Sequence, residues 1–168
     1  MDSKKHQRVL TLDLYTDGAC KSLGKATFGG WGFIAVRDSE RIYFDFGNEN
    51  ATTNQRMELT AVLKALEYSK SIRKPSEHVH VYSDSAYIVN CYLQEWYVKW
   101  IANSFQTSTK KPVANQDLWI QIIPYFDNFW YHFHKVEGHN GVFWNEECDQ
   151  LAQEAAEHLK LTWRGSYE

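Results

Sequence analysis

The chain has 168 residues, of which 43% are hydrophobic and 23% charged, a composition typical of one soluble globular domain and not of a fibrous or disordered protein. The 18 basic and 21 acidic side chains give a formal net charge of −3, which offers no sign of a protein that binds nucleic acid by charge alone. Three scattered cysteines, a polar N-terminus and no apolar run of about 20 residues exclude a disulfide scaffold and predict a cytoplasmic protein without a signal peptide or membrane span.

Alternating apolar and polar residues predict three strands in the first third of the chain. The first strand covers 9–16, the second 29–37 and the third 41–47, and a loop at 21–28 separates the first two. Only residues 38–40 lie between the second and third strands, so these two are expected to form a hairpin.

The apolar period then changes to that of a long amphipathic helix. Four apolar residues follow the helical spacing: Leu59, Val62, Leu63 and Leu66. Thr52 and Gln55 have the spacing of a capping box just before this helix, and Pro75 predicts that it ends near Lys74.

The rest of the chain alternates between predicted strands and helices. A strand at 78–84 leads into a helix at 85–93 that Ser85 caps. The segment 96–116 carries aromatic residues, among them Trp96, Trp100 and Phe105, together with three lysines and no acid. The elements expected next are a helix at 115–126 broken at Pro124, a strand at 129–136 and a helix at 145–159. This order predicts an α/β protein with a five-stranded mixed sheet flanked by α-helices. We expect one domain over 1–168, with its core at about 9–160, a short polar N-terminus and a loose C-terminal tail.

Two aspartates mark the ends of predicted strands. Asp17 follows the first strand and Asp84 ends the fourth, so parallel neighbouring strands about 4.8 Å apart would place the two carboxylates side by side. Like charges this close need a cation, and Mg²⁺ prefers such oxygen ligands. Glu58 and Asp149, near the buried faces of their helices, are placed to lean toward this pair. Four carboxylates can hold two metal ions about 4 Å apart for phosphoryl transfer, although any single acid is most often a solvated surface charge.

Histidines and tryptophans add further candidates. His139 lies in the loop EGHNG, where an imidazole near a metal site can transfer protons. His132 and His134 alternate on a predicted strand and resemble a metal pair, but without a third ligand nearby a half-exposed strand face is the favoured interpretation. The spacing of Trp96 and Trp100 alone favours the buried stripe of a short helix.

Seven stretches, in the same order and spacing, resemble type 1 ribonuclease H over about residues 9–159. They are TDGAC (16–20), GGWG (29–32), TNQRMEL (53–59), YSDSAY (82–87), KKPVANQDLW (110–119), VEGHNG (136–141) and NEECDQLA (145–152). The resemblance implies a ribonuclease H-like fold. It also implies hydrolysis of the RNA strand of an RNA–DNA hybrid duplex, with 5′-phosphate and 3′-hydroxyl ends as products.

The resemblance also implies which residues act. The family's four metal-binding carboxylates fall on Asp17, Glu58, Asp84 and Asp149, which would hold two Mg²⁺ ions, with Mn²⁺ as a substitute. Its loop histidine falls on His139. Because all five positions are intact, an active enzyme is expected, and we expect it to be a free-standing monomer.

Substrate contacts of the family fall on seven further positions. Those that contact ribose hydroxyls correspond to Cys20, Asn54 and Gln55. Those that hold a DNA phosphate correspond to Thr53 and Asn115. The aromatic residues that lie against DNA sugars correspond to Trp96 and Trp100.

Several departures from the family pattern affect substrate binding. The loop after Cys20 is longer than usual, Ala86 replaces a common glutamine, and the segment 96–116 has few positive charges. We therefore expect binding to the hybrid to be weaker and less sensitive to salt than in the more basic relatives. Two alternatives remain open at this point: a DNA nuclease of the same superfamily and a non-catalytic hybrid-binding module.

Overall fold

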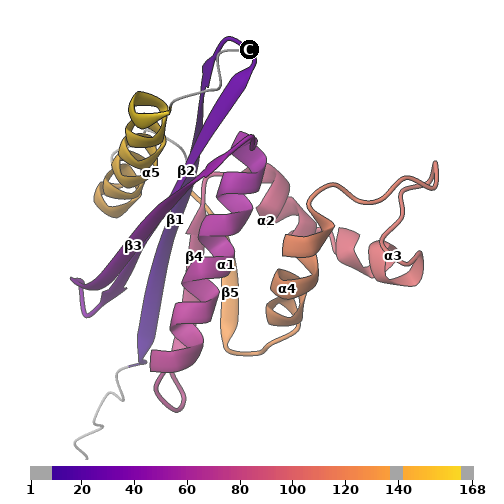
Figure 1. The fold of residues 1–168 in the computed structure, drawn as a ribbon. Coiled ribbons are helices and arrows are strands. Elements are labelled where there is room, and N and C mark those ends of the chain that lie inside the picture. The colour runs from indigo at the N-terminus through magenta and orange to yellow at the C-terminus, as the bar shows by residue number, and fades with distance from the viewer. Residues whose placement is uncertain (1–8, 137–141, 164–168) are drawn as a thin grey trace, which may run out of the picture.

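Five strands form one mixed sheet in the order β3-β2-β1-β4-β5, with helices on both faces (Figure 1). The structure, a computed structural model, describes residues 9–136 and 142–163. The strands are β1 (Thr11–Leu23), β2 (Ala26–Arg37), β3 (Glu40–Asn50), β4 (His78–Ser83) and β5 (Tyr131–Lys135). The helices are α1 (Asn54–Ile72), α2 (Ala86–Leu93), α3 (Trp96–Ala102), α4 (Gln116–Phe126) and α5 (Phe143–Thr162). This architecture confirms the predicted five-stranded mixed sheet flanked by helices.

The central strand β1 changes partners along its length. It pairs antiparallel with β2 as far as Leu23, but its parallel pairing with β4 ends where Tyr15 faces Tyr82. At that point the Thr16 hydroxyl donates a hydrogen bond to the Tyr82 carbonyl oxygen at 2.9 Å. Beyond the Tyr15–Tyr82 pair the two strands no longer pair with each other. Asp17 lies two residues after Tyr15, and Asp84 lies two residues after Tyr82.

Alternating side chains divide the core between the two faces of the sheet. On one face, Leu12 and Leu14 pack with the buried residues of α1 in the main core. On the other face, Ile34 and Val36 pack with Cys148 of α5 in a smaller core. Figure 1 shows α1 and α5 on opposite sides of the sheet. Across the described ranges, none of the helices has the length and apolar character needed to cross a bilayer.

The first hairpin differs from the prediction. The expected strand ends at residue 16 and is followed by a loop at 21–28, whereas β1 continues to Leu23 and β2 begins at Ala26. Gly24 turns the chain between them with a φ of 60°, a conformation that glycine adopts without strain. The prediction was wrong because residues 17–20 are mostly small and lack the apolar alternation that indicates a strand.

Helix ends also differ from the predictions. Thr53, not Thr52, caps α1, and its side chain accepts a hydrogen bond from the Arg56 amide at 3.1 Å. Thr52 is buried instead, and its amide donates to the Thr27 hydroxyl at 3.1 Å. Pro124 does not break α4, because it lies two residues before the helix ends and removes only one helical hydrogen bond there.

The last helix is longer than predicted at both ends. It covers Phe143–Thr162 instead of 145–159, so the first two residues of the expected loose tail, from Leu161, belong to the helix. The N-terminal residues 1–8 and the tail residues 164–168 lie outside the described ranges.

A buried ion pair joins β2 to the residues before β4. Arg37 donates to both carboxylate oxygens of Glu77, at 2.8 and 2.7 Å, and the Glu77 side chain is 0% exposed. Burial alone would raise the pKa of Glu77. However, the hydrogen bonds from Arg37 and from the Lys74 amide hold the pKa below its usual value. The charge of Glu77 therefore depends on Arg37.

Arg37→Met is expected to lower the free energy of unfolding by about 3–5 kcal/mol, because it leaves a buried carboxylate without its cation. Denaturant unfolding of the variant and the wild type measures the difference. Arg41→Met is the control, since Arg41 lies exposed over the Phe44 ring and is expected to lose about 1 kcal/mol or less. Equal losses of unfolding free energy in the two variants would argue against a special dependence of the buried Glu77 charge on Arg37.

Candidate metal centre and nucleic-acid interface

Three carboxylates meet where β1 and β4 separate. Asp17 of β1, Glu58 of α1 and Asp84 after β4 each offer an oxygen, and these three oxygens lie within 4.8 Å of one another. Asp17 is buried and the other two are half-buried. The side-by-side placement of Asp17 and Asp84 that the sequence predicts therefore follows from the parallel pairing of their strands.

Gly18 allows α1 to approach this point. A Cβ atom at Gly18 would lie 2.3 Å from the Glu58 amide nitrogen and 2.5 Å from the Met57 carbonyl carbon, so only glycine fits. The backbone of the first turn of α1 is thus in contact with β1. This contact brings Glu58 to the two aspartates.

Hydrogen bonds fix the carboxylates. The Gly18 amide donates to Asp17 Oδ1 at 2.8 Å, and the Asn54 side chain donates to Glu58 Oε1 at 3.2 Å. The Ser85 side chain also hydrogen-bonds to Glu58 and, as predicted, caps α2 by accepting from the Ile88 amide at 3.3 Å. The residue that caps α2 therefore also orients a carboxylate of the cluster.

The carboxylates hold protons more tightly than usual. Burial, and then the negative charge of Asp84, raises the pKa of Asp17 to about 8, although the Gly18 amide opposes this shift. Burial and the charge of Asp84 also raise the pKa of Glu58 to about 7. A cluster of this kind is stabilised either by protons or by a cation that takes their place.

The ligand set fits a divalent metal ion. Carboxylate oxygens are the donors that Mg²⁺ and Mn²⁺ prefer, and three of them converge from three different elements. A bound cation would remove the repulsion that raises these pKa values. The geometry therefore supports binding of a hard cation at this edge of the sheet.

In the absence of divalent ions, we expect the midpoint of thermal unfolding to fall as the pH rises from about 7 to 8.5, above the ordinary pKa of histidine. The pKa values of Asp17 and Glu58 in the folded state, about 8 and 7, lie above their ordinary values of 3.8 and 4.5. In this pH window the folded state binds more protons than the unfolded state, so raising the pH costs stability. Melts in EDTA across this range measure the effect.

Saturating Mg²⁺ is expected to remove most of this slope, because the ion replaces the protons and binds only the folded chain. A metal-free protein whose stability stays constant or rises over the same range would contradict the raised pKa values.

Asp149 lies beside the three carboxylates but outside the group. It is half-buried on α5 and accepts a hydrogen bond from the Gln153 side chain at 3.5 Å. Its negative charge adds to the raised pKa of Asp17. The preceding residue, Cys148, holds α5 to the sheet, since its thiol donates to the Tyr15 carbonyl oxygen at 3.0 Å. The structure thus brings three of the four predicted ligands together and keeps the fourth within electrostatic reach.

The remaining predicted catalytic residue, His139, lies in the segment 137–141, outside the described residues.

A second set of predicted residues gathers around Arg56. The Arg56 guanidinium donates to both carboxylate oxygens of Asp117, at 3.0 and 2.7 Å, and to the Asn115 side-chain oxygen at 3.4 Å. Its own amide donates to the Thr53 hydroxyl oxygen, which joins the predicted pair Thr53 and Asn115 through one arginine. The ion pair therefore ties the first turn of α1 to the start of α4.

The predicted ribose-contacting residues lie between these two clusters. Asn54 and Gln55 occupy the first turn of α1, with Asn54 exposed and Gln55 half-buried. Cys20 lies on β1, three residues beyond Asp17, and its thiol donates to the Thr52 carbonyl oxygen at 3.6 Å. All three are thus adjacent in the fold to the carboxylates or to the start of α1.

The two predicted tryptophans lie on α3, in the protruding part of the molecule (Figure 1). Both are half-buried and pack against the core. Trp96 lies 5.6 Å from the Tyr87 ring, and Trp100 lies 5.3 Å from the Trp119 ring. The buried-stripe interpretation is therefore confirmed in part, since one side of each ring contacts the core and the remainder is accessible.

The sequence patterns do not predict the part that three residues have in the site. Gly18 and Ser85 have no pattern that indicates their contact with Glu58, although each adjoins a predicted carboxylate. Arg56 stands in the quoted stretch TNQRMEL, but its partner Asp117 is 61 residues away, and no local spacing links them. Only the packing of α1 against α4 reveals this pair.

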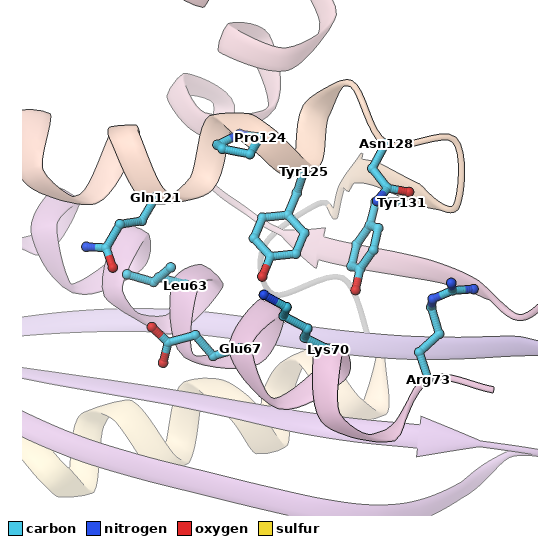
Figure 2. Close-up of a pocket in the computed structure, with 9 residues that line it drawn as sticks. All are labelled: Leu63, Glu67, Lys70, Arg73, Gln121, Pro124, Tyr125, Asn128 and Tyr131. Carbon is cyan, nitrogen blue, oxygen red and sulfur yellow. The ribbon is translucent and has the colours of Figure 1, made fainter. Parts of the chain in front are cut away.

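A separate groove lies between α1 and α4. Its lining includes Glu67, Lys70, Tyr125 and Tyr131, and Figure 2 shows Lys70 and the two tyrosine hydroxyls pointing into it. The lining residues carry charges of both signs and include none of the predicted site residues. Asp17, Glu58 and Asp84 are not part of this groove.

The fold and the acidic cluster define a class of protein. Carboxylates at the end of a mixed sheet, with hydrogen-bonding side chains beside them, are suited to metal-dependent phosphoryl transfer. The sequence profile of the RNase H family matches residues 10–157, and the chain therefore belongs to that family. Its activity is that of an endoribonuclease which hydrolyses the RNA strand of RNA–DNA hybrids, and enzymes of this family depend on a metal ion.

Known relatives extend along most of the chain. Ribonuclease H of Syntrophomonas wolfei subsp. wolfei is 44% identical over 146 residues, which cover 87% of this chain and 96% of the relative. Ribonuclease H of Chlorobaculum parvum is 42% identical over 143 residues, covering 85% and 93%. A foamy viral protease-reverse transcriptase in complex with an RNA/DNA hybrid shares the fold, with a TM-score of 0.77 and 19% identity. That alignment covers 94% of this chain and 22% of the viral one.

Proposed function

We propose that this chain hydrolyses the RNA strand of RNA–DNA hybrids with two Mg²⁺ ions held by Asp17, Glu58, Asp84 and Asp149, and leaves 5′-phosphate and 3′-hydroxyl ends. Mn²⁺ is expected to replace Mg²⁺. The observation that carries this proposal is the convergence of three carboxylate oxygens within 4.8 Å at the end of β1 and β4. Two bound ions of this kind stabilise the attacking and leaving oxygens of an in-line displacement.

The residues of the chain have distinct parts in this reaction. Asp17 and Asp84, on neighbouring strands, fix one side of the centre. Glu58 is held in place by Asn54 and Ser85. Asp149, on α5, approaches from the other face of the sheet and completes the ligand set by a small displacement toward Asp17. His139, from the segment before α5, transfers a proton or assists release of the product.

The hybrid is recognised beside this centre. Thr53 and Asn115 hold a phosphate of the DNA strand, and Arg56 positions both residues. Cys20, Asn54 and Gln55 contact ribose hydroxyls of the RNA strand, the groups that distinguish RNA from DNA. The accessible faces of Trp96 and Trp100 lie against DNA sugars. The viral structure described above, which contains an RNA/DNA hybrid, supports a duplex of this kind as the substrate.

One assay tests the proposed substrate and separates it from the alternatives. The purified chain is incubated with Mg²⁺ and an end-labelled RNA–DNA hybrid, duplex DNA or duplex RNA. Cleavage of RNA in the hybrid alone, with 5′-phosphate ends, is the expected result. Cleavage of duplex DNA would support a DNA nuclease, and binding of the hybrid without any cleavage would support a non-catalytic module.

The phosphate contact has its own test. Thr53→Val combined with Asn115→Ala is expected to raise KM for the hybrid at least about tenfold with a smaller change in kcat, since these residues bind the substrate away from the reacting bond. Thr109→Ala, an exposed threonine outside this cluster, is the control.

We also propose that the chain acts as a single-domain monomer in the cytoplasm, and light scattering of the purified protein tests the monomeric state.

A further inference from the structure

Four histidines form an array on one face of β4 and β5. His78 and His80 alternate with the core residues of β4, and His132 and His134 alternate with those of β5. Parallel pairing of the two strands places His80 opposite His132. All four side chains are half-buried, on the face of the sheet that does not carry α1. His132 and His134 have no other candidate ligand close to them in the sequence, but the structure places His78 and His80 beside them.

The array consists of two close pairs. Nδ1 of His78 lies 2.8 Å from Nε2 of His132, and Nδ1 of His80 lies 2.8 Å from Nε2 of His134. A hydrogen bond between two imidazoles needs one N–H donor and one lone pair, so at least one ring of each pair is neutral. In agreement, burial and the neighbouring histidines lower the pKa of His80 to about 4 and also lower that of His134.

Neutral imidazole nitrogens at this spacing match two adjacent ligands of a transition metal. Metal–nitrogen bonds of about 2.0 Å at right angles, as in the square-planar sites of Cu²⁺ and Ni²⁺, place adjacent nitrogens roughly 2.8 Å apart. The nitrogens of each pair already have this separation. A tautomer change in one ring and a rotation of both rings away from the line between the two nitrogens would turn both lone pairs toward one ion.

The surroundings favour a cation. Asp13 of β1 is the pairing partner of His80 and adds a carboxylate beside the array. Helix α5 packs against β1, β2 and β3 and lies away from β5 in Figure 1, so the histidine face of β4 and β5 is not covered by α5. The array differs in chemistry from the carboxylate cluster, because nitrogen ligands select late transition metals whereas oxygen ligands select Mg²⁺.

We propose that this histidine array is a second metal site, separate from the catalytic carboxylates. It binds a late first-row divalent ion, Cu²⁺ most tightly and Ni²⁺ or Zn²⁺ less tightly, through the two nitrogens of a histidine pair, with water as the remaining ligands. The proposal does not depend on the proposed catalytic mechanism, since none of its ligands belongs to that centre.

The test is titration of the full chain with Cu²⁺ and with Ni²⁺ in saturating Mg²⁺, with the affinity measured by calorimetry. Electron paramagnetic resonance of the Cu²⁺ form identifies the ligand atoms. We expect nitrogen ligands in the spectrum of the wild type. His132→Gln with His134→Gln, and separately His78→Gln with His80→Gln, are expected to weaken binding at least about tenfold. Circular dichroism establishes that each variant is folded.

His158→Gln is the matched control, because His158 is an exposed histidine on α5 outside the array. It is expected to leave the affinity unchanged. An electron paramagnetic resonance spectrum of the wild type that shows only oxygen ligands would by itself overturn the proposal. The same conclusion would follow if a folded double variant bound Cu²⁺ as tightly as the wild type, or if His158→Gln weakened binding as much as the double variants.

Discussion

Asp17→Asn is expected to lower kcat/KM for the RNA–DNA hybrid at least about 1,000-fold while raising the thermal stability of the metal-free protein. The activity falls because the amide removes a charged oxygen ligand from the centre of the carboxylate cluster. The stability rises because Asp17 is buried beside Asp84, which makes its negative charge unfavourable without a cation. A fold-supporting residue would instead lower both quantities.

The measurements are single-turnover hydrolysis in Mg²⁺ and thermal unfolding in EDTA at pH 8. Glu154→Gln is the control, because Glu154 is an exposed acid on α5 that hydrogen-bonds only to its helical neighbour Gln150 among the contacts described. It is expected to change neither quantity appreciably. Retention of full activity by Asp17→Asn would remove Asp17 from the metal site and with it the proposed centre.

Gly18→Ala is expected to reduce activity at least about 100-fold, although position 18 offers no side chain to the substrate. The new Cβ atom would overlap backbone atoms of Met57 and Glu58, which cannot rotate away as the end of a side chain can. The first turn of α1 must then move off β1, which carries Glu58 away from Asp17 and Asp84. We also expect a loss of about 1–3 kcal/mol in the free energy of unfolding, as is typical of overpacking.

Gly24→Ala separates the two effects. Gly24 has open space around it but a φ of 60°, so alanine there costs stability through backbone strain at the hairpin tip without displacing α1. This variant is expected to lose about 1 kcal/mol and to keep its activity. Mg²⁺ affinity, measured by calorimetry, should fall for Gly18→Ala only. Equal activities of the two variants would mean that Glu58 does not need its close approach to β1.

The part of the site that the sequence predicts depends on local position within strands. Asp17 and Asp84 each follow an alternating strand, and the ends of parallel neighbours meet at one edge. The strand order β-β-β-α-β likewise predicts the mixed sheet, because short hairpin connections give antiparallel pairs and a helix allows a parallel one.

The part that could not be predicted depends on contacts between distant segments or on residues without a pattern. The extension of β1 beyond residue 16 passes through small side chains that show no alternation. Arg56 and Asp117, which join α1 to α4, are 61 residues apart in the sequence. The two histidines of each pair, which join β4 to β5, are 54 residues apart. The displacement of Asp149 from the other three carboxylates depends on how α5 packs against the sheet, which the helical period does not determine.

The separation of β1 from β4 beyond Tyr15 has a consequence for folding. The carboxylates on either side of it are brought together by a contact that spans 66 residues, between Thr16 and Tyr82. Such a long loop closes only when the central strands have paired, so the unfolded chain and early collapsed states lack a binding site for the ion. Hydrogen exchange of the β1 and β4 amides should therefore slow with increasing Mg²⁺ concentration, since the ion suppresses only those openings that part these two strands.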